Sequence, residues 1–261
     1  MAEIQYGIRT KNINKSYDKK QVLFNVSMKV PKGKIYGLLG PSGCGKTTLV
    51  KVLVGILKAG SGTAYIGEST LPSLKATSEI GYMSQSAALY PTLTGYENLK
   101  FFGSLYCLKG QELEDRIHYV SSLVHLTDDL QKKVGNYSGG MQQRLSLAIS
   151  LLPNPSVLLL DEPTVGIDPL LRQEIWQELH RLSEKGVTIL ITTHVMDEAE
   201  KCHYLGMMRD GRILVSDTPE NILKATGCSS VEDAFILLSA PKQSREKAHE
   251  DAYEGGGNDE N

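Results

Sequence analysis

The sequence has no uncharged stretch long enough to cross a lipid bilayer. A membrane-spanning helix needs about 20 consecutive apolar residues. The longest uncharged stretches, residues 80–96 and 145–160, are shorter, and Pro91, Pro153 and Pro155 interrupt them. The N-terminus lacks the basic and apolar regions of a secretory signal. We therefore expect a cytoplasmic protein, unless a partner holds it at a membrane.

The chain also lacks a basic tract. Its 28 Lys and Arg residues stand against 30 Asp and Glu residues, which gives a formal net charge of −2. Proteins that bind phosphate backbones carry clustered Lys and Arg side chains. We therefore expect no nucleic acid among its partners.

Cysteine is scarce, with four in 261 residues. The four show no spacing typical of paired metal ligands, and nothing indicates an oxidising compartment, so we expect reduced thiols. For Cys107, Cys202 and Cys228 the plain interpretation is a small buried apolar side chain. Cys44 lies inside a motif and is considered with it.

Strand-like and helix-like patterns alternate along much of the chain, and no internal repeat is present. Continuous apolar runs at residues 35–39, 156–160 and 187–191 predict strands buried on both faces of a sheet. Helical patterns follow at residues 47–57 and 170–185. This order predicts an α/β fold with a mostly parallel sheet.

Two segments depart from this alternation. In the middle of the chain helical patterning dominates, and helices are expected over residues 97–106, 111–124 and 141–152. Nearer the C-terminus, Asp210-Gly211 between strand-like runs at 204–209 and 212–217 predicts an antiparallel hairpin. Thr218 followed by Pro219 then predicts the start of a helix.

We therefore predict an α/β core of residues 1–85 and 154–220, with a helical subdomain of residues 86–153 inserted into it. Residues 221–240 are expected to form C-terminal helices. Residues 241–261 lack apolar periodicity and carry three basic against six acidic side chains, 3 − 6 = −3. This composition predicts a disordered acidic tail, whose plain interpretation is a solvated segment without function.

A glycine-rich motif joins the first predicted strand to the first predicted helix and fits G-x-x-x-x-G-K-[ST]. It consists of Gly40, Pro41, Ser42, Gly43, Cys44, Gly45, Lys46 and Thr47. The glycines allow backbone N–H groups to surround phosphates, and the helix N-terminus adds positive potential. Lys46 is expected to contact the β- and γ-phosphates, and Thr47, with Thr48 beside it, to face Mg²⁺. The motif predicts a nucleoside triphosphate site.

Cys44 within this motif lies near a predicted helix N-terminus. Such a position can lower the pKa of a thiol. Cys44 is therefore a candidate for inhibitory alkylation, and a passive loop residue is the alternative.

Two carboxylates end the buried strand near residue 160. We expect Asp161 to hold Mg²⁺ through its water shell, and Glu162 to orient the attacking water as a base. His194 follows the next buried strand, at a sheet edge where ligand-contacting groups gather. A neutral imidazole there is a candidate to contact the γ-phosphate, and a plain loop histidine is the alternative.

These motifs and several others, taken in order, resemble the ATP-binding-cassette ATPases over residues 8–217. The set comprises Tyr17, residues 40–47, Gln85, Tyr137-Ser138-Gly139-Gly140-Met141, Asp161-Glu162, Gly166-Ile167-Asp168 and His194. The resemblance implies a RecA-like P-loop NTPase core that includes antiparallel β elements, and it implies ATP with Mg²⁺ as the bound nucleotide.

The resemblance also implies roles for single residues. Tyr17 would stack on adenine. Gln85 would sense Mg²⁺ and the attacking water, which places it with Thr47 and Asp161 on the metal side. Asp168 would lie in a loop that crosses to a partner subunit.

Ser138, Gly139 and Gly140 introduce a predicted helix and form a second potential anion site. In the family this signature closes over the ATP of an opposing subunit. The resemblance therefore implies a head-to-tail pair of ATPase subunits, identical or different, with nucleotide between them.

The variant signature is similar to that of the drug-resistance and export branch of the family. Met141 stands where glutamine is most common, and residues 230–235 resemble the C-terminal helix motif of that branch. The resemblance implies an ATPase that powers export through a separate permease of the ABC-2 type, peripheral on the inner face of the membrane.

Two alternatives remain. A non-transport ABC ATPase acting on nucleic acid or the ribosome is disfavoured, because Lys46 and Ser138 are too close for an intervening coiled coil and the chain has one cassette. A scaffold without ATPase activity is disfavoured by the intact Lys46, Asp161, Glu162 and His194.

Residues 85–96 are uncharged and moderately apolar. The resemblance implies that they line a groove that receives a short helix of the permease. The alternative is that Leu89, Tyr90 and Leu93 pack inside the helical subdomain.

Overall fold

The computed structural model describes residues 5–86 and 88–240. Its central sheet has the strand order β10-β9-β3-β8-β7-β6. The strands are β3 (Ile35–Leu39), β6 (Ile80–Met83), β7 (Val157–Asp161), β8 (Thr188–Thr193), β9 (Tyr204–Arg209) and β10 (Arg212–Asp217). All neighbours are parallel except β10, which pairs with β9 in an antiparallel hairpin. Every residue of β3, β7 and β8 is buried, as expected of strands covered on both faces.

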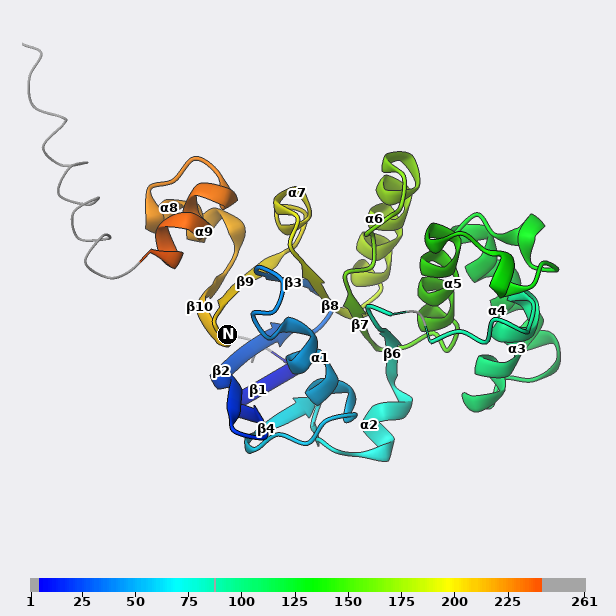
Figure 1. Cartoon of the computed structure of the whole chain (residues 1–261), viewed down its shortest axis with the longest axis horizontal. Helices are drawn as coiled ribbons and strands as arrows, with labels where there is room; N and C mark the ends of the chain where they lie inside the picture. Colours follow the sequence, from blue (N-terminus) through cyan, green and yellow to red (C-terminus); the bar gives the residue numbers. More distant parts are fainter. Residues whose placement is uncertain (1–4, 87, 241–261) are drawn as a thin grey trace, which may run out of the picture.

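A second, antiparallel sheet has the order β2-β1-β4-β5. It consists of β1 (Tyr6–Tyr17), β2 (Lys20–Pro31), β4 (Ser61–Ile66) and β5 (Ser69–Thr70). The helix α1 (Lys46–Val54) lies between the two sheets (Figure 1). Its Leu49 and Leu53 pack with Ile8 of the second sheet and with Leu38 and Leu190 of the central sheet.

The opposite face of the central sheet is covered by α6 (Pro169–Glu184). Ile35, Ile189 and Ile191 point to this face because side chains alternate along a strand. They belong to one apolar cluster with Ile175 and Trp176 of α6. The sheet is thus enclosed between α1 and α6.

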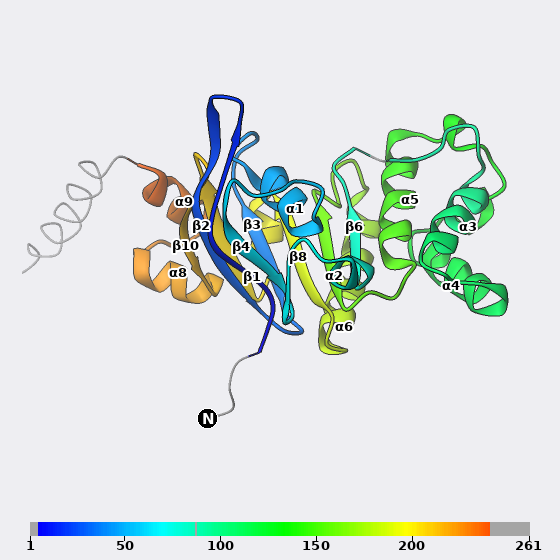
Figure 2. The same cartoon turned by 90° about the horizontal axis from the view of Figure 1, so that it is seen from below.

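Helices α3 (Gly95–Leu105), α4 (Gly110–Leu123) and α5 (Gly139–Leu151) lie together at one end of the molecule, beyond β6 (Figures 1 and 2). A capping box begins α3: Thr94 accepts from Glu97 N, and Glu97 accepts from Thr94 N. Helices α8 (Pro219–Thr226) and α9 (Val231–Ser239) lie at the other end. The short helices are α2 (Leu74–Ser78), α7 (Met196–Ala199) and two 3₁₀ turns, Thr127–Asp129 and Val134–Asn136.

Most predicted elements are present, with shifted bounds. The helix expected over 47–57 ends at Val54, because Gly55 takes the left-handed conformation with φ of 84° and closes it. The strand expected over 187–191 runs to Thr193, which brings it level with the site. The hairpin at Asp210-Gly211 and the helix start at Thr218-Pro219 have the predicted positions. The division into domains stays a prediction, and the expected acidic tail lies outside the described residues.

The expectation of buried cysteines is wrong for Cys107, which is exposed, whereas Cys202 is buried and Cys228 is half-buried. Burial raises the pKa of the Cys202 thiol far above its usual range. Cys107 follows α3 in a turn with φ of 63°, a conformation found outside regular elements.

Candidate functional site

The candidate site lies at the carboxyl ends of β3, β7 and β8. These ends are level, because Leu39 pairs with Thr193 and Asp161 pairs with Thr192. In open parallel sheets, ligands bind at this edge. The three segments that follow these strands carry the glycine-rich motif, the two carboxylates and His194.

The glycine-rich motif forms a loop that leads directly into α1. Gly40 must be glycine, because a Cβ there would lie 2.3 Å from the Met208 carbonyl oxygen. Gly45 precedes α1 with φ of 110°, which places the backbone in a region that side chains disfavour. The loop borders a cavity of about 130 Å³. Its lining residues are Val22, Ser42, Gly43, Gly45, Lys46, Thr47, Thr48, Gln85 and Glu162.

Lys46 is the first residue of α1, and its side chain is only 5% exposed. Its ammonium group donates to the carbonyl oxygens of Gly40 (2.7 Å) and Pro41 (3.1 Å). It also lies 3.9 Å from Oε1 of Glu162. The loop therefore surrounds the Lys46 ammonium group, which faces the Glu162 carboxylate just after β7.

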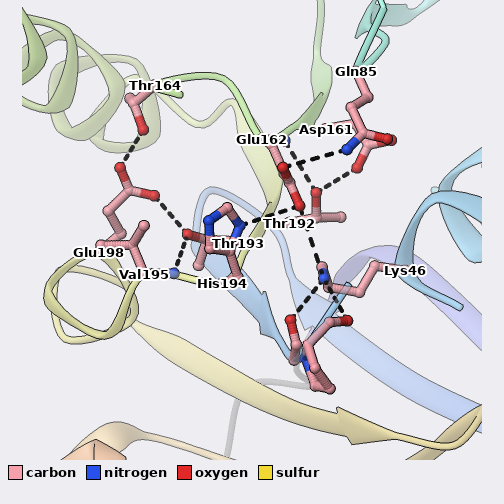
Figure 3. Close-up of polar contacts among 12 residues, drawn as sticks. Lys46, Gln85, Asp161, Glu162, Thr164, Thr192, Thr193, His194, Val195 and Glu198 are labelled. Carbon is pink, nitrogen blue, oxygen red and sulfur yellow. Dashed lines mark hydrogen bonds and ion pairs between the residues drawn. The ribbon is translucent and has the colours of Figure 1, made fainter. Parts of the chain in front are cut away.

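The other predicted catalytic side chains converge on the carboxylate of Glu162 (Figure 3). Besides Lys46, its carboxylate lies 3.3 Å from His194 Nδ1 and accepts from Gln85 Nε2 at 3.4 Å. Glu162 has a φ of 55°, which is unusual for a residue with a side chain. Backbone strain of this kind persists where the surroundings fix it and is concentrated at functional sites. Four predicted catalytic residues, Lys46, Gln85, Glu162 and His194, are thus brought together.

Asp161 is fully buried beside this group. Its Oδ1 accepts from the Thr192 hydroxyl at 2.5 Å, while its Oδ2 has no hydrogen-bond partner among the described residues. A buried carboxylate oxygen without a partner is costly, unless a cation or a donor reaches it. The negative charge of Asp161 also contributes, after burial, to raising the pKa of Tyr82 to about 12.

Sequence reasoning missed Thr192 and Gln143. The Thr192 hydroxyl, besides donating to Asp161, accepts from Glu162 N at 3.1 Å, so it holds the Asp161 carboxylate and the Glu162 backbone. In the sequence it is only a β-branched residue of a buried strand. Gln143 of α5 donates to the Glu162 carbonyl oxygen at 3.0 Å. No sequence signal indicates this contact, because its acceptor is a backbone atom 19 residues away.

The signature residues lie apart from this cavity. Ser138 is the N-cap of α5 and accepts from Met141 N at 3.2 Å. A Cβ at Gly139 would meet no atom within 4 Å, and one at Gly140 would lie 3.0 Å from the Gly166 carbonyl oxygen. None of the three is among the residues that line the cavity.

Tyr17 also lies outside the cavity lining. It ends β1, is 44% exposed, and has the Lys15 ammonium 5.6 Å from its ring centroid. Asp168 caps α6 by accepting from Leu171 N at 3.0 Å. Tyr17 and Asp168 are therefore both exposed at the surface.

The expectation of a lowered thiol pKa at Cys44 is wrong. Cys44 is buried, and this desolvation raises its pKa above the ordinary value of 9.0. The nearby charge of Lys46 acts in the opposite direction and is outweighed. The alternative of a passive loop residue agrees with this environment.

Comparison with protein families matches residues 23–165, just over half of the chain, to the family described as "ABC transporter". The chain belongs to this family. Among curated ABC relatives, the probable multidrug ABC transporter ATP-binding protein YbhF of Escherichia coli is 39% identical over 239 residues, covering 88% of this chain. The chain spans only 41% of the length of YbhF. The linearmycin resistance ATP-binding protein LnrL of Bacillus subtilis is 35% identical over 241 residues, with 88% of this chain and 78% of LnrL covered.

Solved ABC structures share the fold. An ATP-binding subunit of an ABC transporter superposes with a TM-score of 0.84 at 26% identity, covering 89% of this chain and 99% of its own. An ATP-binding cassette solved as a dimer after hydrolysis, with ADP and phosphate, gives a TM-score of 0.76 at 27% identity, covering 81% and 98%. The predicted ABC family and its α/β P-loop fold are confirmed. Within the described residues, no helix is long and apolar enough to span a membrane.

Proposed function

We propose that this chain binds ATP with Mg²⁺, hydrolyses it in a head-to-tail dimer, and powers export of a substrate through a separate membrane permease. The observation that carries the proposal is the group around Glu162. One cation, one imidazole and one amide converge on the carboxylate of Glu162, whose backbone is strained, beside a glycine-rich loop. This set of groups suits in-line transfer of a phosphoryl group to water.

ATP would bind with its phosphates in the loop of residues 40–47. The backbone N–H groups at the N-terminus of α1 and the Lys46 ammonium supply the positive potential. To reach phosphate oxygens, Lys46 exchanges its contacts with the Gly40 and Pro41 carbonyl groups for charge-assisted ones. Tyr17, exposed at the end of β1, offers a ring face for adenine.

The residues present fit Mg²⁺. Thr47 and Gln85 line the cavity, and the unpartnered Oδ2 of the buried Asp161 would accept from the water shell of the ion. No cluster of three His, Cys, Asp or Glu side chains forms a separate metal site in the described parts of the chain. Mg²⁺ is usually coordinated by a few protein side chains together with water and the phosphates of a substrate. The ion, when bound, neutralises charge that develops on the phosphate oxygens.

Hydrolysis would use Glu162 as the general base. A water held by the Glu162 carboxylate and the Gln85 amide attacks the γ-phosphorus and gives its proton to Glu162. The bond from the γ-phosphorus to the bridging oxygen breaks, leaving ADP and phosphate. His194 and Lys46 stabilise the charge on the transferred group.

The dimer would complete the site with the signature of a second subunit. Ser138, Gly139 and Gly140 do not line the cavity of their own chain, although they form a serine-capped helix start suited to anions. A partner arranged head to tail would present this helix start to the ATP held here. The partner cassette would be a second ABC ATPase, identical or different.

The permease would bind at the groove beside the helical end of the molecule. A cavity of about 320 Å³ lies between the α/β core and α3 and α5, lined by Tyr82, Leu89, Phe102 and Ile149 among others. Tyr90 follows the lining residue Leu89 and is 45% exposed, with its ring 4.9 Å from that of Phe101 and 6.1 Å from that of Phe102, which lines the cavity. Leu89 and Leu93 are half-buried. This apolar surface supports docking of a short helix.

The position of Tyr90 is fixed by Asn98 of α3. The Asn98 side chain is fully buried, accepts from Tyr90 N at 2.9 Å and donates to Tyr90 O at 3.1 Å. It also donates to Thr94 O at 2.9 Å. The exposed ring of Tyr90 is therefore held on an anchored backbone, which suits a docking residue better than a core residue.

We further propose an ABC-2-type permease and a place on the inner face of the membrane. The support is the similarity to YbhF and LnrL, whose names describe multidrug transport and linearmycin resistance.

The proposal is tested with the purified chain by measuring ATP binding and phosphate release, with Mg²⁺ and with EDTA. We expect release that needs Mg²⁺, and loss of ATP binding in Lys46→Ala. Lys51→Ala serves as the control, because Lys51 is a half-buried lysine of the same helix that does not line the cavity. A folded wild-type chain that neither binds nor hydrolyses ATP would overturn the proposal.

A further inference from the structure

A buried carboxylate lies behind the candidate site and has no part in the chemistry proposed above. Glu198 belongs to α7, and its side chain is 3% exposed. Among the residues that the structure describes, no Lys, Arg or His lies within ion-pair distance of it. A buried carboxylate costs desolvation free energy, and an apolar side chain serves packing equally well. Its contacts therefore indicate what it does.

Glu198 joins the two loops that carry the catalytic side chains (Figure 3). Its Oε2 accepts from the Thr193 hydroxyl at 2.7 Å, and its Oε1 accepts from the Thr164 hydroxyl. Thr193 directly precedes His194, and Thr164 follows Glu162 by two residues. The two oxygens of one carboxylate thus connect the segment of His194 to the segment of Glu162.

The Thr193 contact fixes the backbone on both sides of His194. The Thr193 hydroxyl donates to Glu198 and accepts from Val195 N at 3.0 Å. The Thr193 carbonyl oxygen accepts from Gly40 N at 3.3 Å, which ties the same residue to the start of the phosphate loop. Because the carboxylate can only accept, it sets the direction of these two hydrogen bonds. Val195 N–H donates to the Thr193 hydroxyl, and that hydroxyl donates to Glu198.

Thr164 connects the same carboxylate to the loop that leads to Asp168. This loop packs against the signature, since a Cβ at Gly140 would lie 3.0 Å from the Gly166 carbonyl oxygen. Its Val165 is 47% exposed. A displacement of this loop would therefore reach Glu198 through Thr164, and the backbone of His194 through Thr193.

We propose that Glu198 is a positioning residue that holds the His194 side chain at its place beside Glu162. It also couples that placement to the loop of residues 164–168. The inference rests on the proposed hydrolysis, because it assigns Glu198 an effect on turnover through His194. Glu198 does not line the cavity of the candidate site. Loss of its acceptor oxygens frees the turn at His194 and leaves the phosphate loop formed.

The test compares Glu198→Gln and Thr193→Val with wild type in the full chain. The amide introduced by Glu198→Gln would present a donor to a hydroxyl that now donates, and valine removes the hydroxyl while keeping its shape. We expect kcat to fall about tenfold in each, as for a misplaced catalytic group. ATP affinity and Tm should stay at wild-type values. Thr193→Ser should restore the turnover lost in Thr193→Val.

A double-mutant cycle separates positioning from a general loss of order. His194→Ala alone is expected to lower kcat by about 10²-fold. Adding Glu198→Gln to His194→Ala should lower kcat no further, because the position of an absent imidazole no longer matters. Glu200→Gln, which changes an exposed glutamate two residues on, is the matched control and should behave as wild type.

The outcomes are distinct. Wild-type kcat in both Glu198→Gln and Thr193→Val overturns the inference, and so does an additive loss in the double variant. If Glu198→Gln does not fold, Thr193→Val and its cycle with His194→Ala give the same decision. A wild-type chain without ATPase activity would instead contradict the proposed function, and the two failures are therefore distinguishable.

Discussion

The side-chain amide of Gln143 donates to the backbone carbonyl oxygen of Glu162 over 3.0 Å. This contact joins α5, which begins with the signature, to the residue on which the site converges. Replacing Gln143 with leucine removes the donor while keeping the size of the side chain. A hydrogen bond contributes about 1 kcal/mol, so we expect kcat to fall roughly fivefold. Steady-state ATPase measurements with Gln111→Leu, at an exposed glutamine of α4, as control would check this. An unchanged kcat would mean that the contact does not orient Glu162.

Glu162→Gln should retain ATP binding and lose turnover. The amide keeps the shape and the contact with Gln85 but cannot accept a proton, so kcat should fall by about 10²-fold or more. Binding is measured with a fluorescent nucleotide, and turnover by phosphate release. Glu184→Gln, at an exposed glutamate that ends α6, is the control. Hydrolysis at the wild-type rate would remove Glu162 from the role of base.

ATP should drive Glu162→Gln into a dimer, because the nucleotide is bound and not consumed. Sedimentation velocity with and without ATP measures the change. In the single chain a side chain at Gly139 meets nothing within 4 Å, so Gly139→Glu should fold and bind ATP normally. In the dimer its charge would face phosphate, so adding Gly139→Glu should abolish the shift. A monomer at high concentration with full ATPase activity would contradict the shared site.

Cys44 should resist alkylation at neutral pH. Its pKa is raised above 9.0 by burial, so the thiolate that reacts becomes abundant only as the pH rises beyond that value. Peptide mass spectrometry after iodoacetamide treatment across a pH series should find Cys107, which is exposed, modified before Cys44 at pH 7. Bound ATP should slow modification of Cys44 further. Rapid labelling of Cys44 at pH 7 would show that the loop opens.

Charge at the groove should break the permease complex and leave the ATPase intact. Tyr90→Glu and Leu93→Glu place charges where an apolar helix is proposed to dock, so co-purification with the permease should fail. Tm and the ATPase rate of the isolated chain should persist. Leu74→Glu, on the highly exposed side chain of α2, is the control. Loss of folding would favour packing of these residues inside the helical subdomain, and intact co-purification would exclude the segment from the interface.

Local motifs made part of this structure predictable. The glycine-rich loop and the Asp210-Gly211 turn depend on neighbouring residues, and their positions follow from the sequence. The partners of Glu162 were predictable as a set, because strands of a parallel sheet end at one edge. The contacts of Thr192, Gln143 and Glu198 were not, since each depends on packing between distant segments. The pKa of Cys44 was misjudged because burial outweighs the nearby positive charge.

The anchoring of Tyr90 by Asn98 has a mechanical consequence. Both backbone polar groups of Tyr90 are held by a side chain that is itself buried in α3. A force on the Tyr90 ring is therefore expected to be transmitted to α3, because the backbone of Tyr90 cannot shift without breaking its hydrogen bonds to Asn98. On the other side, Gln85 contacts Glu162 through one hydrogen bond of 3.4 Å, which yields easily. The backbone of Tyr90 is therefore held more firmly than the side-chain contact of Gln85, and we expect the contact at Gln85 to change first under load.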